Sequence, residues 1–85
     1  MAGPSIVALV QTSDAAPSQW EGQLSDGRWL YVRYRHAELS IGVGGTLDEA
    51  IRVSNAVDAE VTGRSPSEAS WEDVAPYVLA RLVRA

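Results

Sequence analysis

The chain of 85 residues contains no cysteine. This absence excludes disulfide bonds, thiolate metal sites and cysteine nucleophiles. Because secreted proteins of this size often depend on disulfides, it also favours a reducing, cytoplasmic location. We therefore expect a fold stabilised by an apolar core, without thiol chemistry.

Lysine is also absent: all seven basic residues are arginine, against eleven acidic residues, and the net charge is −4. A negative charge disfavours nucleic acid as the main partner, because phosphate binding needs a basic surface. The missing lysine, with twelve alanines and ten valines, is typical of a high-GC genome such as that of an actinobacterium or one of its phages. We expect an accessory or phage-encoded protein whose partner is another protein.

No segment reaches the roughly 20 apolar residues that a membrane-spanning helix requires. The apolar run from Ile6 to Val10 lacks the basic leader of a signal peptide. With 46% hydrophobic and 21% charged residues, the chain has the composition of a globular protein. We expect one domain over residues 1–85, with residues 1–4 flexible and no membrane partner.

Apolar residues that alternate with polar ones predict strands over about residues 19–24, 28–35 and 38–43. A segment over about residues 5–11 is apolar at both even and odd positions. This pattern predicts a further strand that is covered on both faces.

The turns predict the register of these strands. A three-residue loop with Gly27 in a left-handed conformation pairs Trp20 with Val32, and a two-residue turn at His36–Ala37 pairs Val32 with Ile41. Both hairpins then place the apolar side chains on one core face. That face is predicted to comprise Trp20, Leu24, Leu30, Val32, Tyr34, Leu39, Ile41 and Val43.

A first helix is predicted over about residues 47–62. Thr46 and Glu49 have the spacing of a capping box at its start, and Gly63 is suited to its end. The segment between them carries an apolar stripe with helical spacing.

A second helix is predicted over about residues 74–84. With Asp73 as its cap, Pro76 falls in the first turn, where a missing N–H costs little. Strands followed by helices indicate an α+β fold. We expect an antiparallel sheet of three to four strands with both helices packed on one face.

Candidate catalytic groups are few. His36 is the only histidine, and no nucleophile or metal ligand lies near it in the sequence. The acidic pairs Asp48–Glu49 and Glu72–Asp73 lie at predicted helix starts, where carboxylates stabilise the helix dipole. We expect no enzyme activity, no catalytic residue, no metal site and no cofactor.

The glycine-rich segment 42–46 ends a predicted strand and opens a predicted helix, a context that can bind phosphate. The dinucleotide fingerprint, however, requires a glycine where Leu47 stands, and the P-loop lysine is missing. Asp48 and Glu49 would repel a phosphate. We therefore expect no nucleotide site.

The stretch from Gly45 to Ile51, which follows the hairpin strands, resembles the strand-to-helix passage of HicB-like antitoxin domains. It spans seven of the 85 residues. The proline-rich segment that precedes this passage in the family is missing here, and the sequence shows no DNA-binding module. The resemblance implies an antitoxin-like protein that neutralises a toxin partner.

The outer face of the predicted sheet is the candidate binding surface, because exposed Trp, Tyr and Arg side chains are enriched in binding hot spots. In the predicted register its two rings lie across from Gly44 and Gly42, so they could instead cover these glycines. The second helix or the N-terminus could also cover this face. The candidate binding residues are Trp29, Tyr31, Arg33, Arg35 and Glu21.

We expect a non-catalytic protein-interaction module that binds through this face. Self-association into a homodimer is its simplest form, because the apolar first strand could pair with its copy at a sheet edge. The alternatives are a sheet platform for single-stranded nucleic acid and an antitoxin-like partner protein.

Overall fold

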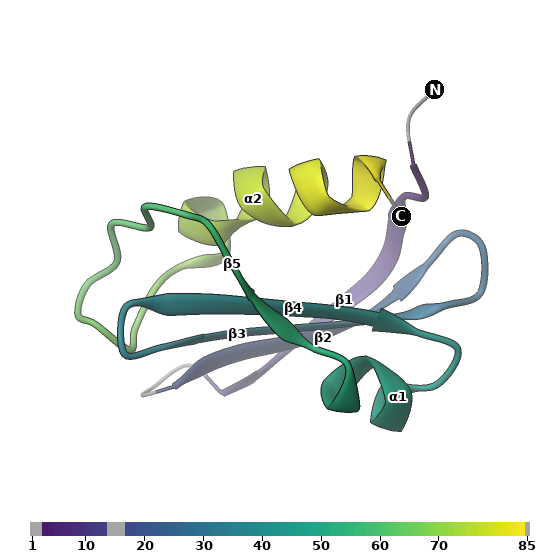
Figure 1. Cartoon of the computed structure of the whole chain (residues 1–85), viewed down its shortest axis with the longest axis horizontal. Helices are drawn as coiled ribbons and strands as arrows, with labels where there is room; N and C mark the ends of the chain where they lie inside the picture. Colours follow the sequence, from purple (N-terminus) through teal and green to yellow (C-terminus); the bar gives the residue numbers. More distant parts are fainter. Residues whose placement is uncertain (1–2, 14–16, 85) are drawn as a thin grey trace.

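The computed structural model describes residues 3–13 and 17–84, and in it an antiparallel sheet of five strands curves around one helix (Figure 1). The elements are β1 (Ile6–Ser13), β2 (Ser18–Leu24), β3 (Trp29–Arg35), β4 (Glu38–Gly44), α1 (Leu47–Arg52), β5 (Asn55–Val57) and α2 (Trp71–Val83). The strands lie side by side in chain order. The predicted α+β class is confirmed, with a fifth strand added. Among the described residues, no helix has the length and apolar character to cross a membrane.

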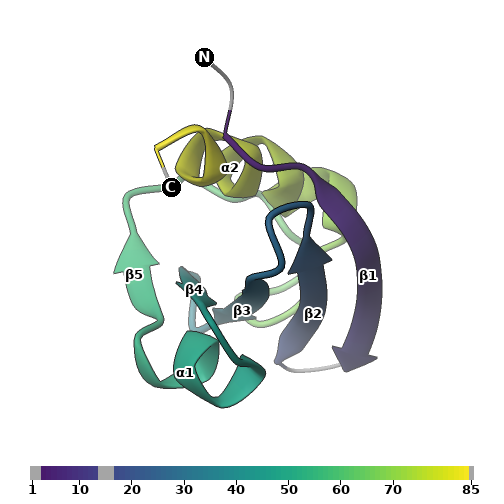
Figure 2. The ribbon, with the colours of Figure 1, turned by 90° about the vertical axis from the view of Figure 1, so that its right-hand side faces the viewer.

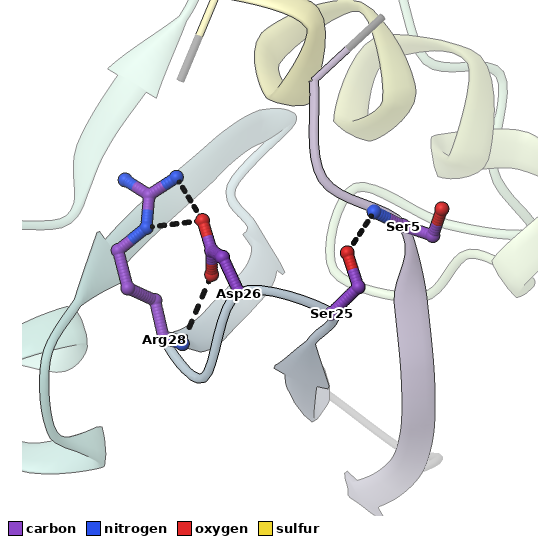
Figure 3. Close-up of polar contacts among 4 residues, drawn as sticks. All are labelled: Ser5, Ser25, Asp26 and Arg28. Atoms are coloured by element: carbon purple, nitrogen blue, oxygen red, sulfur yellow. Dashed lines mark hydrogen bonds and ion pairs between the residues drawn. The ribbon is translucent and has the colours of Figure 1, made fainter.

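The loop between β2 and β3 has the predicted three residues. Gly27 has a φ of 90°, and its N–H donates to the carbonyl of Leu24 at 3.0 Å. The Asp26 carboxylate accepts a hydrogen bond from the backbone N–H of Arg28 at 3.0 Å and forms an ion pair with the guanidinium at 2.7 Å (Figure 3). The loop is thus closed by both its backbone and its side chains.

The turn between β3 and β4 has the predicted two residues, both left-handed. His36 has a φ of 53° and Ala37 a φ of 58°, as in a type I′ turn. The connector before α2 holds this turn, because His36 N donates to Ser67 Oγ at 3.1 Å and Ala37 N donates to the carbonyl of Pro66. These hydrogen bonds explain how two residues other than glycine can both adopt a left-handed backbone conformation here.

The predicted register is confirmed: Trp20 lies opposite Val32, and Val32 lies opposite Ile41. The apolar set lines the concave face of the sheet, where α2 packs on it (Figure 2). The Trp20 ring meets the ring of Trp71 with centroids 5.8 Å apart. The buried core comprises Trp20, Leu24, Leu30, Val32, Tyr34, Leu39, Ile41, Ala69, Val74, Val78 and Leu82, with Val43 half-buried against it.

The first helix is shorter than predicted. It ends at Arg52, and the chain then forms β5, in which Ala56 pairs with Ser40 of β4. Val57, Ala59 and Val61 are half-buried against the core at every second position. The helix predicted for this segment was therefore wrong beyond Arg52, because the apolar residues there follow the period of an extended chain.

The two helices lie on opposite faces of the sheet, so the expectation that both pack on one face was wrong (Figures 1 and 2). α2 fills the concave face, whereas α1 packs against β3 and β4 on the other face. A Cβ placed on Gly42 would lie 1.9 Å from the carbonyl oxygen of Ala50. The glycines of β4 thus admit the backbone of α1 directly onto the strand.

The second helix begins earlier than predicted, at Trp71. Ser70 is its cap: Ser70 Oγ accepts from Asp73 N at 3.2 Å, and Asp73 Oδ2 accepts from Ser70 N at 3.0 Å. Asp73 therefore closes a capping box as the third helical residue and is not the cap. Pro76 consequently lies inside the helix, on an exposed side where the unpaired carbonyl one turn earlier can meet water.

β1 is an edge strand and pairs only with β2 within the described sheet. The expectation that both its faces are covered was wrong, since the side chains of Val7 and Val10 are 63% and 62% exposed. Its start is joined to the β2–β3 loop, because Ser5 N donates to Ser25 Oγ at 3.0 Å (Figure 3).

Candidate functional site

The five candidate residues lie on the outer face, which we define as the face of β2, β3 and β4 opposite α2. Strand alternation places them there, since each is one residue away from a core position. Glu21 pairs with Tyr31, and Arg33 pairs with Gln19. The register thus brings the candidate residues onto one face, and their role in binding stays a prediction.

The two aromatic residues offer little of their surface. Tyr31 is only 7% exposed, and Trp29 is half-buried. They pair with Gly42 and Gly44, the two residues of β4 on which α1 rests. The first helix, and not the second helix or the N-terminus, therefore covers this part of the outer face.

The two arginines lie beyond α1, towards the turn between β3 and β4. Arg33 is half-exposed and Arg35 exposed. They border a hollow of about 260 Å³, which we call the arginine hollow; it is lined by Arg33, Arg35, His36, Glu38 and Ser40. Glu21, Trp29 and Tyr31 lie outside this lining, so the candidate set divides into two parts.

The lining of the arginine hollow carries two guanidinium groups, of Arg33 and Arg35, and one carboxylate, of Glu38. Within residues 3–13 and 17–84, neither Arg33 nor Arg35 forms an ion pair, although Glu38 lies directly across from Arg35. Arg35 Nε donates instead to His36 Nε2 at 3.1 Å. Both guanidinium groups therefore remain available to an external anion.

Three residues of the arginine hollow were not among the candidate binding residues: His36, Glu38 and Ser40. The cross-strand register could have identified two of them, since Ser40 pairs with Arg33 and Glu38 with Arg35. His36 follows from the turn, which folds its ring beside the Arg35 side chain.

Glu49 and Asp73, each in the first turn of a helix, are engaged in capping. Glu49 Oε1 accepts from Gly45 N at 2.7 Å, and Thr46 Oγ1 accepts from Glu49 N at 3.1 Å. A carboxylate thus already occupies the backbone donor that a phosphate would use at the glycine-rich segment. Asp73 serves the start of α2 in the same way.

Comparison of the chain with protein-family models, curated proteins and solved structures found no match. The segment that resembles HicB-like antitoxins, residues 45–51, forms the cap and most of α1. Its implied role, the neutralisation of a toxin partner, stays a prediction. The residues and geometry of the chain itself are therefore the basis for a proposed function.

Proposed function

We propose that this protein is a small protein-interaction module that binds an acidic segment of a partner at the arginine hollow. The observation that carries the proposal is a pair of arginines, Arg33 and Arg35, that border one hollow without an ion pair in the described part of the chain. Residues two apart on a strand lie on the same face, about 7 Å from each other. Two neighbouring carboxylates of an acidic peptide can span that distance, each bonded to one guanidinium.

The arginines project from a strand that is central in the sheet and packed in the core on its other face. β3 lies between β2 and β4 in the sheet, and its core side chains Leu30 and Val32 are fully buried. Ser40, which pairs with Arg33, is 8% exposed and lines the hollow. Side chains that start from a fixed backbone lose less entropy on binding, which favours recognition of an extended partner.

An acidic protein segment fits this surface better than a single-stranded nucleic acid does. Sheet platforms bind single strands by stacking bases on exposed rings. Tyr31 is 7% exposed and Trp29 is half-buried, so neither offers an open ring face. The net charge of −4 also opposes binding to a polyphosphate chain.

The test is fluorescence anisotropy with a fluorescein-labelled hexaglutamate peptide at low salt. We expect the double variant Arg33→Gln/Arg35→Gln to weaken binding at least about ten-fold, the loss of two charge-assisted contacts. Arg64→Gln is the matched control, because Arg64 is exposed and lies outside the hollow. It should change affinity less than about two-fold. Equal effects of the two changes, or no binding by the wild-type chain, would refute the proposal.

A further inference from the structure

β1 is an edge strand without the usual protection. Its eight residues, Ile6–Ser13, include no charged residue, no proline and no glycine. Proteins commonly block edge strands with charges or prolines, or keep them short. β5, at the other edge, has only three residues and is followed by Asp58. The free side of β1 is therefore the side on which the sheet can be extended.

The backbone of β1 is regular at its centre. The register with β2 shifts between Ile6 and Ala8 and again between Gln11 and Ser13. Between these bulges, Ala8–Gln11 pairs residue by residue with β2. This central stretch offers its outward-pointing N–H and C=O groups in the spacing that an added antiparallel strand requires.

Exposed apolar side chains lie next to β1 on both faces of the sheet. On the outer face, Val10 is 62% exposed beside Glu21. On the concave face, Leu79 and Val83 of α2 are 51% and 57% exposed. They border a groove of about 520 Å³ between the start of the chain and α2, whose apolar lining includes Pro4, Ile6, Leu9, Trp71, Leu79 and Val83. An added strand would thus find apolar contacts on either side of its backbone.

We propose that β1 pairs antiparallel with β1 of a second copy of this chain, so that two five-stranded sheets become one. This goes beyond the proposed function and does not depend on it, because the arginine hollow lies at the turn between β3 and β4. β1 carries no charge, so the pairing brings no like charges together at the seam itself.

The charges on α2 favour an antiparallel arrangement of the two copies. α2 runs opposite to β1: Asp73, near its start, shares a hollow with Gln11, and its end at Leu82 lies against Gly3. The start of α2 is acidic and its last turn contains Arg81. A two-fold axis places the acidic start of one α2 towards the basic end of the other, whereas parallel pairing would place like ends together.

The alternation of faces restricts the register of this dimer. Opposite residues of an antiparallel pair share a face, and in β1 Leu9 lies on the core side whereas Val10 lies on the outer side. The two-fold axis must therefore pass beside a residue and not between two residues. The registers that pair most of the regular stretch Ala8–Gln11 place the axis beside Leu9 or Val10.

Sedimentation equilibrium of the full chain tests the dimer. We expect wild-type dimers with a dissociation constant below about 1 mM. Val10→Lys should raise that constant at least about ten-fold, because it places charges into the seam from both copies. Val53→Lys is the matched control: Val53 is 44% exposed and follows α1, away from β1. Circular dichroism checks that both variants are folded.

Two outcomes would overturn the dimer. One is a wild-type chain that stays monomeric up to about 1 mM, a concentration at which even weak pairs associate. The other is an equal effect of Val10→Lys and Val53→Lys on association.

Cross-linking tests the strand itself. Because the chain has no cysteine, Val10→Cys introduces a single thiol at the seam. Its two copies lie opposite or diagonally across the seam, within about 8 Å in either register, so a short bismaleimide should join them. Val53→Cys is the control and should remain uncrosslinked. Equal yields from the two variants would contradict pairing through β1.

Discussion

At the scale of single residues, the turn between β3 and β4 carries the least favourable backbone of the described chain. His36 and Ala37 are the non-glycine residues with positive φ among residues 3–13 and 17–84. An L-residue in this region costs about 1–2 kcal/mol. The bonds to Pro66 and Ser67 offset part of that cost, so the segment before α2 helps to hold the turn whose His36 lines the arginine hollow.

Replacing Ala37 by glycine should relieve this strain. Ala37→Gly removes the Cβ penalty at φ 58° but adds backbone entropy to the unfolded chain. We expect a net stabilisation of about 0.5–1 kcal/mol in urea unfolding. Gly27→Ala makes the reverse change at φ 90° in open space and should destabilise by about 1 kcal/mol. Two shifts of the same sign would show that strain does not control these turns.

The carboxylate of Asp26 makes stability depend on pH. Hydrogen bonds from the Arg28 side chain, and then from its backbone, hold the pKa of Asp26 below its ordinary value near 3.8. A lowered pKa stabilises the folded state above the unfolded value, and the gain is lost as pH falls through the folded value. Asp26→Asn should thus be less stable than wild type at pH 7, and the difference should shrink as the pH falls below 3.8 and through the lowered pKa. A difference in unfolding free energy that stays constant down to pH 2 would exclude this role.

At the scale of elements, local patterns predicted the strands well. Period-two alternation and the chemistry of two short turns are contained in neighbouring residues, so the register of Trp20, Val32 and Ile41 follows from them. β5 escaped prediction because its pairing depends on a distant strand, β4. The start of α2 was missed because Ser70 and Asp73 are both good caps, and only the structure distinguishes their roles.

The candidate site was predictable to the same degree. Alternation placed Glu21, Arg33 and Arg35 on one face, which requires only the local strand pattern. The burial of Tyr31 was not predictable, because it depends on α1 resting on Gly42, a tertiary contact. The arginine hollow likewise depends on how the turn folds back onto β3.

The close packing of α1 on β4 can be tested by a substitution that adds a single methyl group to β4. In Gly42→Ala the added Cβ would lie 1.9 Å from the carbonyl oxygen of Ala50, so α1 must move. We expect a loss of about 2–3 kcal/mol in urea unfolding and greater exposure of Tyr31. Gly45→Ala is the matched control, since its Cβ meets nothing closer than 3.6 Å. Equal stability of the two variants would show that α1 does not pack closely against Gly42.

At the scale of the whole molecule, self-pairing through β1 would leave the arginine hollows free. A two-fold axis perpendicular to the joined sheet keeps both outer faces on one side. Each hollow lies at the turn between β3 and β4, two strands away from the seam. A dimer would therefore present two acid-binding sites on one surface.

Dimerisation also makes thermal stability depend on protein concentration. Dimer formation stabilises the folded state by mass action, so the melting temperature rises with protein concentration. For a chain of 85 residues we expect a rise of about 3–5 °C per ten-fold increase in concentration above the dissociation constant. Val10→Lys should move the onset of this dependence to at least about ten-fold higher concentrations, whereas Val53→Lys should leave it unchanged. A melting temperature independent of concentration in the wild type would contradict a dimer.

Binding of an acidic segment at the arginine hollow is tested most directly by a nuclear magnetic resonance titration of the ¹⁵N-labelled chain with hexaglutamate. Binding at the arginine hollow predicts that the largest amide shifts occur at Arg33, Arg35, Glu38 and Ser40, with little change in α2. The side-chain Nε resonances of the two arginines should shift with them. Shifts that are absent, or that spread evenly over Arg52, Arg64 and the other exposed arginines, would contradict the proposed binding site.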